Sequence, residues 1–382
     1  MVKILTIIGA RPQIIKAAAL SRAIKNKYSK KIKEVIVHTG QHYDENMSQV
    51  FFDELDIPHP DYNLNAGSGM HGKQTAFMIE SIEEVLLKEK PNCIVVYGDT
   101  NSTLAGAIAA SKIHVPVIHV EAGLRSFNKS MPEEINRIMC DHVSTLLFSP
   151  TKAGVGNLVK EGFDKNNKGP YSIDNPKVYH CGDVMYDNSL YFSSIADKTS
   201  SVLKENGLED GRYILATIHR NNNTDEPVRL NALFRAMNKI ARNNKIKIII
   251  PLHPRTEKLL SHNLTPELYS LIKTSDYIKI LPPVSFIEMI ALEKHAQLVM
   301  TDSGGVQKEA FFFKKPCIIL RSETEWVELV KSKSAIVVDA DESKILKAYN
   351  YFLKAKKLNF PSLFGDGKAA EFICDEILRN IK

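Results

Sequence analysis

Short apolar runs alternate along the chain with stretches whose apolar residues recur at helical spacing. In the first half, the apolar runs predict strands at residues 3–8, 35–39, 93–97, 117–120, 146–149 and 178–181. The amphipathic stretches predict helices at 12–25, 45–55, 75–88, 103–112, 133–143 and 151–161. Strands separated by helices of this length are typical of a parallel, doubly wound sheet, since right-handed crossovers return the chain to the same sheet.

The polar segment 197–211 interrupts this pattern, which then resumes. Strands are predicted at 213–218, 246–251, 278–281, 298–301, 317–320 and 335–338, and helices at 227–242, 286–293, 306–313, 325–331 and 342–356. We therefore predict an α/β protein with two Rossmann-like domains, residues 1–195 and 205–362, and a C-terminal segment, 363–382. Ligands of such folds bind beyond the carboxyl ends of the strands, so we expect the site in the cleft where the two domains face each other.

Composition narrows the class of protein. The chain has 382 residues, 44% of them hydrophobic, which suffices for two cores of ordinary size. Its longest apolar runs have the length of a strand and no secretory signal follows Met1, so we expect a cytoplasmic protein without a membrane segment. The five cysteines are scattered and indicate neither disulfides nor a zinc site. The net charge of +6 lies in lysine-rich stretches without interleaved aromatic residues, which argues against nucleic-acid binding.

One glycine-rich segment imitates a nucleotide motif. Gly67, Gly69 and Gly72 have the spacing of a dinucleotide fingerprint, and with Lys73 they match most of a P-loop. Both motifs require a buried strand that runs into the loop, whereas residues 61–65 are largely polar. We therefore predict a glycine-rich lead-in to a helix, and no nucleotide cofactor.

Polar residues follow three predicted strands of the first half directly. Arg11 stands beside a helix start, where it would either bind a phosphate or tie down the loop. Asp99 would either react or cap a helix. Glu121 ends a buried strand, which is costly unless the carboxyl group is paired or protonated. At helical spacing Glu133 shares a face with Arg137 while Glu134 points elsewhere, which indicates either a surface ion pair or a third converging carboxylate.

The second half has a comparable set of residues. Ser303 suits a helix N-cap, and Gly304 and Gly305 let a ligand approach the backbone amides, which predicts a diphosphate site. Glu309, one turn further on, could accept hydrogen bonds from ribose hydroxyls. His219 and His253 also end predicted strands; one such histidine is usually structural, but two in one domain favour a functional role.

These motifs, in this order over essentially the whole chain, resemble the non-hydrolysing UDP-N-acetylglucosamine 2-epimerases, which have a glycosyltransferase-B-type fold. The resemblance rests on GARP at 9–12, GDT at 98–100, HVEAGLR at 119–125, PEE at 132–134, NR at 136–137, HR at 219–220, DSGG at 302–305, Glu309 and GDG at 365–367. It implies that the last helix, 369–381, crosses back onto the first domain.

The resemblance also implies the chemistry. Family members eliminate UDP from carbon 1 while removing the hydrogen of carbon 2, and then add UDP back to the 2-acetamidoglucal with protonation on the opposite face. No metal or nicotinamide is required. Asp99, Glu121 and Glu133 would be the acid and base, in either assignment, and His219 would stabilise or protonate the leaving phosphate. The ligand-binding residues would be Arg11, Lys16 and Arg137 on the sugar and phosphate side, and His253, Phe286, Ser303, Gly304, Gly305, Glu309 and Arg321 around UDP.

Three departures from the family pattern bear on the substrate. Gln13 replaces the glutamate of Thr-Arg-Pro-Glu, the spacing of a Gln-His-x-x-Met segment is broken between Gln41 and Met47, and Trp326 interrupts a Thr-Glu-Arg-Pro-Glu run. They resemble the branch that epimerises UDP-2,3-diacetamido-2,3-dideoxyglucuronic acid for lipopolysaccharide synthesis. We therefore predict a homodimeric enzyme that interconverts UDP-GlcNAc and UDP-ManNAc, with the diacetamido sugar as the alternative substrate. A glycosyltransferase of the same fold, a hydrolysing epimerase and a nucleotide-sugar sensor remain further alternatives.

Overall fold

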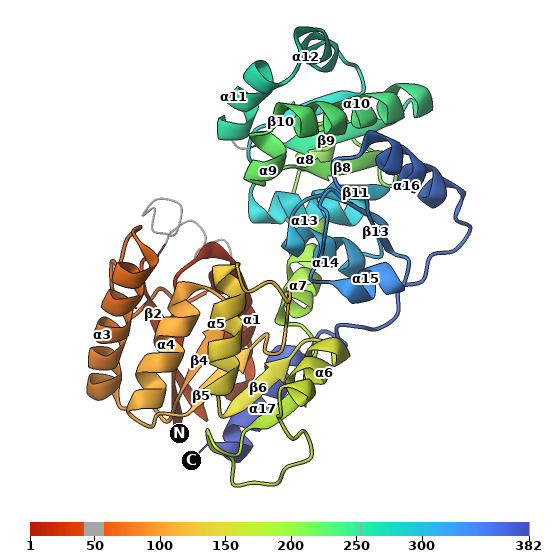
Figure 1. Ribbon diagram of the computed structural model, residues 1–382. Coiled ribbons are helices and arrows are strands. Elements are labelled where there is room, and N and C mark those ends of the chain that lie inside the picture. The colour runs from red at the N-terminus through yellow and green to blue at the C-terminus, as the bar shows by residue number, and fades with distance from the viewer. Residues whose placement is uncertain (42–56, 253, 382) are drawn as a thin grey trace. The chain divides into compact units, whose positions relative to one another are not determined.

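The computed structural model describes residues 1–41, 57–252 and 254–381. The chain forms two compact units, each built on one parallel sheet (Figure 1). Unit 1 comprises Met1–Asn188 and Ser362–Lys382, and unit 2 comprises Ser189–Pro361. The chain thus leaves unit 1 after Asn188 and returns to it after Pro361.

The sheet of unit 1 has seven strands among the described residues. In spatial order they are β3 (Tyr62–Asn63), β2 (Ile32–His38), β1 (Val2–Ile8), β4 (Cys93–Tyr97), β5 (Val117–Val120), β6 (Leu146–Ser149) and β7 (Lys177–His180), and all neighbours are parallel. The order reverses between β1 and β4, and open α/β sheets bind their ligands at such a switch point.

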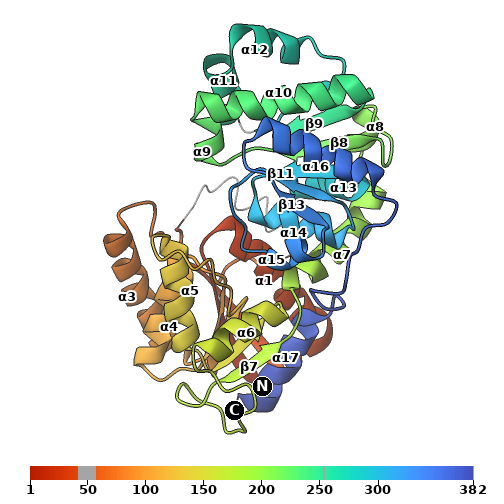
Figure 2. The same cartoon turned by 45° about the vertical axis from the view of Figure 1, so that its right-hand side comes forward.

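Helices cover both faces of this sheet. They are α1 (Arg11–Ala23), which continues as the π-helical turn η1 (Ile24–Tyr28), α3 (His71–Glu89), α4 (Asn101–Lys112), α5 (Pro132–His142), α6 (Lys152–Lys160), α7 (Val184–Thr199), which runs into unit 2, and α17 (Ala369–Asn380). Helix α4 packs between α3 and α5, while α1 packs on α17. Figure 2, compared with Figure 1, shows these two groups on opposite faces of the sheet.

Unit 2 repeats the same arrangement. Its six parallel strands among the described residues are, in spatial order, β10 (Ile278–Leu281), β9 (Lys247–Pro251), β8 (Tyr213–Thr217), β11 (Leu298–Thr301), β12 (Cys317–Ile319) and β13 (Ala335–Val337). Its helices are α8 (Val202–Glu205), α9 (Asn221–Thr224), α10 (Pro227–Asn244), α11 (Pro254–Asn263), α12 (Pro266–Lys273), α13 (Phe286–His295), α14 (Gly304–Phe312), α15 (Val327–Lys331) and α16 (Glu342–Lys354). The switch point lies between β8 and β11.

Each unit has its own hydrophobic core. Every residue of β4 and of β8 is buried, because helices cover both faces of these central strands. The predicted α/β class with two doubly wound, Rossmann-like sheets is therefore confirmed. Within the described residues, no helix is both long enough and apolar enough to cross a membrane.

Several elements differ from the sequence-based prediction. Strand β3 and helices α7, α8, α9, α11 and α12 are additional, and the predicted helix at 45–55 lies outside the described residues. The glycine-rich segment 67–73 leads into α3, which begins at His71, and the side chain of Gln74 donates a hydrogen bond to the Gly67 carbonyl (2.6 Å). The two-residue strand β3 precedes this loop, which the sequence does not predict, but its residues are half-buried and exposed, so it is not the buried strand that both motifs require.

Two glycines pack against each other where the chain leaves and re-enters unit 1. Gly182 and Gly365 both have φ of +84°, and the backbone N–H of Asp183 donates to the carbonyl of Phe364 (3.0 Å). A Cβ on Gly182 would lie 2.8 Å from the Phe364 oxygen, so the two segments meet backbone to backbone. One turn later, the Asp187 carboxylate accepts hydrogen bonds from the first two amides of α17, at 3.2 and 2.8 Å, and so caps that helix.

This contact predicts that Gly182→Ala destabilises unit 1. The added methyl group would collide with the Phe364 carbonyl and hold alanine in a left-handed conformation, so we expect unit 1 to lose about 2–4 kcal/mol of unfolding free energy. Urea denaturation followed by circular dichroism measures it. Gly156→Ala is the matched control, because Gly156 lies within α6 with open space around it. This substitution should raise the unfolding free energy by about 0.5–1 kcal/mol. Equal changes of unfolding free energy in Gly182→Ala and Gly156→Ala would contradict the close contact of Gly182 with Phe364.

Candidate active site

In unit 1, the buried side chain of Gln13 organises the loop between β1 and α1. Its Oε1 accepts hydrogen bonds from the amides of Gly9 (2.9 Å) and Ala10 (3.1 Å). Its Nε2 donates to the carbonyl of Tyr97 (3.1 Å) and to Oγ1 of Thr103 (2.9 Å). Gln13 therefore links the end of β1 to the end of β4, across the switch point. Gln13 thereby fixes the backbone of Gly9 and Ala10. Helix α1 begins directly after them, with the exposed Arg11 as its first residue.

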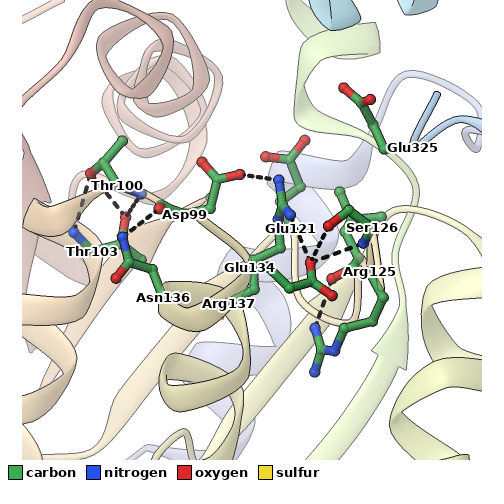
Figure 3. Close-up of polar contacts among 12 residues, drawn as sticks. Asp99, Thr100, Thr103, Glu121, Arg125, Ser126, Glu134, Asn136, Arg137 and Glu325 are labelled. Carbon is green, nitrogen blue, oxygen red and sulfur yellow. Dashed lines mark hydrogen bonds and ion pairs between the residues drawn. The ribbon is translucent and has the colours of Figure 1, made fainter. Parts of the chain in front are cut away.

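Helix α5 holds Asp99 at the end of β4 (Figure 3). The side chain of Asn136 donates a hydrogen bond to the Asp99 carbonyl (2.9 Å), and the guanidinium group of Arg137 forms an ion pair with the Asp99 carboxylate. Burial alone would lower the pKa of Arg137, but the charges of Asp99, Glu134 and Glu121 outweigh it and raise that pKa. Asp99 is thus fixed through both its backbone and its side chain.

The carboxylate of Glu121 lies beside the same strand end. It forms an ion pair with Nζ of Lys16, and the pair covers Gly98: a Cβ at Gly98 would lie 2.9 Å from Lys16 Nζ and 3.3 Å from Glu121 Oε2. Glu121 has φ of +78°, a conformation that costs a non-glycine residue about 1–3 kcal/mol and persists only where the surrounding structure holds it.

Lys16, Asp99, Glu121 and Arg137 therefore gather at the carboxyl ends of β4 and β5, next to the switch point. The side chains of Asp99 and Glu121 are 28% and 9% exposed, so both carboxylates are partly shielded from water. Carboxylates in such a place can take and give protons, and the two cations can stabilise negative charge that develops nearby. The cluster has the groups for acid–base chemistry on an anionic ligand.

The acidic pair at the start of α5 differs from expectation. Arg137 donates to Glu134 (2.9 Å), so the prediction that Glu134 points away from Arg137 is wrong. The reason lies in the preceding loop: the amides of Ser126 and Phe127, both at 2.9 Å, and the Ser126 hydroxyl, at 3.0 Å, converge on the buried Glu134 carboxylate. Burial would raise the pKa of Glu134, but these hydrogen bonds hold it below its ordinary value. Glu133 is exposed, and within the described part of the chain its side chain makes no hydrogen bond or ion pair.

In unit 2, the buried carboxylate of Asp302 joins the two strand ends at the switch point. It accepts hydrogen bonds from the amide of His219 (3.1 and 3.2 Å), the amide of Arg220 (3.1 Å) and the side chain of Asn223 (3.0 Å). The backbone of His219 is thereby fixed at the end of β8, while the residue itself is exposed. The sequence pattern does not indicate this role for Asp302, because an aspartate after a strand reads equally well as a helix cap.

The N-terminus of α14 follows immediately. Ser303 occupies the N-cap position, although its side chain makes no capping hydrogen bond, and Gly305 is exposed. A Cβ on Gly304 would lie 2.1 Å from Oε1 of Glu325, whose carboxylate pairs with the buried Arg321 (3.1 Å). The positive end of α14 thus has a carboxylate against it, as expected of a place that attracts anions.

The remaining predicted site residues are spread over unit 2. Phe286 is buried at the start of α13 and packs edge-on against Phe192, with ring centroids 5.2 Å apart. Glu309 is buried on α14, and burial together with the charge of Glu309 raises the pKa of the fully buried Glu293 well above its ordinary value. His253 lies outside the described residues. No group of three or more potential metal ligands occurs among the residues that the structure describes.

The bonds of Gln13 predict a pH-dependent effect of Gln13→Glu. An ionised carboxyl group cannot donate to the Tyr97 carbonyl, so we expect a loss of about 1–3 kcal/mol of stability at pH 8. The folded state would raise the pKa of the introduced group above about 4.3, so the deficit should shrink as the pH falls through that raised value and the group regains a proton. Urea denaturation between pH 8 and 5 measures this trend. Gln297→Glu, at an exposed position, should show almost no change of stability with pH. A loss of stability in Gln13→Glu that stays constant with pH would contradict the hydrogen bonds of Gln13.

Comparisons with known proteins agree with this architecture. A UDP-2,3-diacetamido-2,3-dideoxy-D-glucuronate 2-epimerase of Pseudomonas aeruginosa is 46% identical to this chain, with 99% of each protein covered. A UDP-N-acetylglucosamine 2-epimerase of Methanocaldococcus jannaschii is 44% identical, with 97% of each covered. The crystal structure of Methanocaldococcus jannaschii UDP-GlcNAc 2-epimerase in complex with UDP-GlcNAc and UDP gives a TM-score of 0.84 at 43% identity, with 99% of each chain covered.

The family assignment rests on a match over most of the chain. The family model described as UDP-N-acetylglucosamine 2-epimerase matches residues 24–378, which contain both sheets except β1 and the site residues described above except Arg11, Gln13 and Lys16. The chain therefore belongs to the UDP-N-acetylglucosamine 2-epimerase family, whose members are isomerases.

Proposed function

We propose that the protein is a non-hydrolysing 2-epimerase that interconverts UDP-GlcNAc and UDP-ManNAc. The observation that carries this proposal is the cluster of Asp99, Glu121, Lys16 and Arg137 at the switch point of unit 1. Two carboxylates beside two cations suit a reaction in which a proton leaves carbon while an anion departs. The relative from Methanocaldococcus jannaschii supports UDP-GlcNAc as the substrate, and the relative from Pseudomonas aeruginosa supports the diacetamido uronic acid as the alternative.

The proposed reaction is an elimination followed by an addition. The hydrogen on carbon 2 is not next to a carbonyl group, so its removal as a proton needs a leaving group at carbon 1. A carboxylate takes this proton, the electrons of the C–H bond form the double bond between carbons 1 and 2, and the C–O electrons leave with UDP. Addition of UDP with protonation of the opposite face of carbon 2 completes the inversion. Asp99, Glu121 and Glu133 are the proposed acid and base, and Lys16, Arg11 and Arg137 the proposed cations.

Residues of unit 2 are proposed to hold UDP. The N-terminus of α14, with Ser303, Gly304 and Gly305, offers backbone amides and a positive helix end to the diphosphate. The carboxylate of Glu325 lies against Gly304, so it has to turn away when a diphosphate binds there. His219 is proposed to stabilise or protonate the leaving phosphate, and the other proposed contacts with UDP are His253, Phe286, Glu309 and Arg321.

We also propose a homodimer located in the cytoplasm. Three large apolar side chains are exposed on helices that both pack on α4: Phe77 on α3 (42%), and Ile135 (39%) and Met139 (42%) on α5. Large apolar side chains exposed on the helices that flank α4 favour a protein contact on this side of the sheet, and a second copy of the chain can supply the same surface. With the diacetamido sugar as the substrate, the proposed role is in lipopolysaccharide synthesis.

Deuterium exchange tests the proposed function. Incubation of the protein with each UDP-sugar in deuterated water should incorporate deuterium at carbon 2 as the epimer forms, which NMR detects. Incorporation into UDP-GlcNAc alone supports the main proposal, and incorporation into the diacetamido sugar alone supports the alternative. Steady release of free UDP would indicate a hydrolysing epimerase. Transfer to an acceptor without exchange at carbon 2 would indicate a glycosyltransferase, and no exchange into either sugar would contradict both epimerase proposals.

The two adjacent glutamates of α5 offer a matched pair of variants. Glu133→Gln should leave thermal stability unchanged, because the residue is exposed, but should lower the exchange rate at least ~10²-fold if Glu133 is an acid or base. Glu134→Gln should cost about 1–3 kcal/mol of stability, because the amide turns a donor toward the loop amides. Differential scanning calorimetry and the exchange assay separate the two effects. Full activity of Glu133→Gln would remove this residue from the proposed mechanism.

A further inference from the structure

A buried histidine lies between the two strand ends that carry Asp99 and Glu121. His119, on β5, is fully buried, and its two ring nitrogens each have a partner. Nδ1 lies 2.7 Å from Oδ1 of Asp141, and Nε2 lies 2.9 Å from the carbonyl oxygen of Gly98. The sequence gives this residue no role beyond its place in the HVEAGLR motif.

The partners determine the protonation of the ring. A carbonyl oxygen only accepts, so Nε2 must carry a proton. Asp141 accepts a hydrogen bond from the Gly123 amide (3.1 Å) and forms an ion pair with Arg125 (2.7 Å), so its carboxylate is ionised and also only accepts. Nδ1 must therefore carry a proton too, and His119 is an imidazolium cation.

The charges around this cation are balanced. Arg125 also pairs with Glu161 (2.6 Å), so His119 and Arg125 face two carboxylates, those of Asp141 and Glu161. Burial by itself would lower the pKa of His119, but Cys140 and Asp141 oppose this effect and raise the pKa well above its ordinary value. A buried charge is tolerated when it is paired and hydrogen-bonded in this way.

We propose that His119, held by Asp141, is a positioning residue that locks the ends of β4 and β5 together and so sets the distance between the Asp99 and Glu121 carboxylates. Gly98, whose carbonyl it binds, directly precedes Asp99, and Gly123, which Asp141 binds, follows Glu121 by two residues. The inference rests on the proposed function, because it assumes that both carboxylates act on one substrate.

The charged form of the ring is essential to this role. A neutral imidazole has a proton on one nitrogen only, so either the Gly98 carbonyl or Asp141 would lose its donor. Gly98 has φ of +66° and no side chain, so its peptide would then have little else to fix it besides the backbone hydrogen bond from its amide to Val120 (3.0 Å). Asn136 and Arg137 hold Asp99 onto α5, but they do not connect it to β5.

Histidine-labelled full-length protein tests the charge directly. Both ring nitrogens of His119, identified by the signals lost in His119→Gln, should show the ¹⁵N shifts of protonated nitrogen throughout pH 6 to 9. A ring that titrates within this range, or that is neutral, would overturn the inference. This measurement requires no substrate, so it stands even if the exchange assay shows that the proposed function is wrong.

Kinetics test the positioning role. His119→Leu removes both donors and should lower kcat for exchange at carbon 2 by about 10- to 100-fold, with KM near that of the wild type. His119→Gln, which can still donate to the Gly98 carbonyl, should retain more of kcat than His119→Leu.

Leu86→Ala is the control for mere loss of stability, because it empties a buried position on α3 away from this network. It should lower the melting temperature while kcat per folded molecule stays unchanged. If His119→Leu behaves in the same way, or if Gln and Leu at this position lower kcat equally, the positioning role is wrong. An active wild type with an unaffected His119→Leu would also reject it while leaving the proposed function intact.

Discussion

The geometry of both candidate sites depends on buried polar side chains that tie neighbouring strand ends together. In a parallel sheet the ladder of backbone hydrogen bonds ends with the strands, so the residues beyond it need other partners. Gln13 connects β1 to β4, the His119–Asp141 pair connects β4 to β5, and Asp302 connects β11 to β8. Each bridge binds the backbone at, or directly next to, a residue proposed to contact the ligand.

Charged bridges, unlike the neutral amide of Gln13, give precision at some expense in stability. Moving an ion from water into a protein interior costs several kcal/mol, which its partners recover only in part, so apolar residues would serve the cores as well or better. Charged bridges have directional hydrogen bonds, however, and apolar contacts do not. They keep strand ends in one arrangement, which matters where a small displacement of an acid or base slows a reaction. The left-handed backbone of Glu121 indicates that the same stretch also carries strain.

Much of this could be predicted from the sequence, and the exceptions have physical reasons. Asp99 and Glu121 stand directly after buried strands, so the alternation of strands and helices is enough to predict that both lie at the same edge of the sheet. The partner of Arg137 could not be predicted, because helical spacing allows both Glu133 and Glu134 and the loop amides of Ser126 and Phe127 decide between them. The bridging roles of Gln13 and Asp302 could not be predicted, since each binds a backbone group more than eighty positions away along the chain.

The return of the chain to unit 1 has a consequence for synthesis on the ribosome. Unit 2 is continuous in sequence, so all of its strands are available once Pro361 has been made. Unit 1 lacks α17 until residues 369–380 have been made, and until then the surface of α1 and the carboxylate of Asp187 lack the partner that covers them. Most of unit 1 therefore precedes unit 2 in the sequence but completes its packing only after unit 2 has been made, so nascent chains expose an incomplete unit 1 for as long as unit 2 is being made.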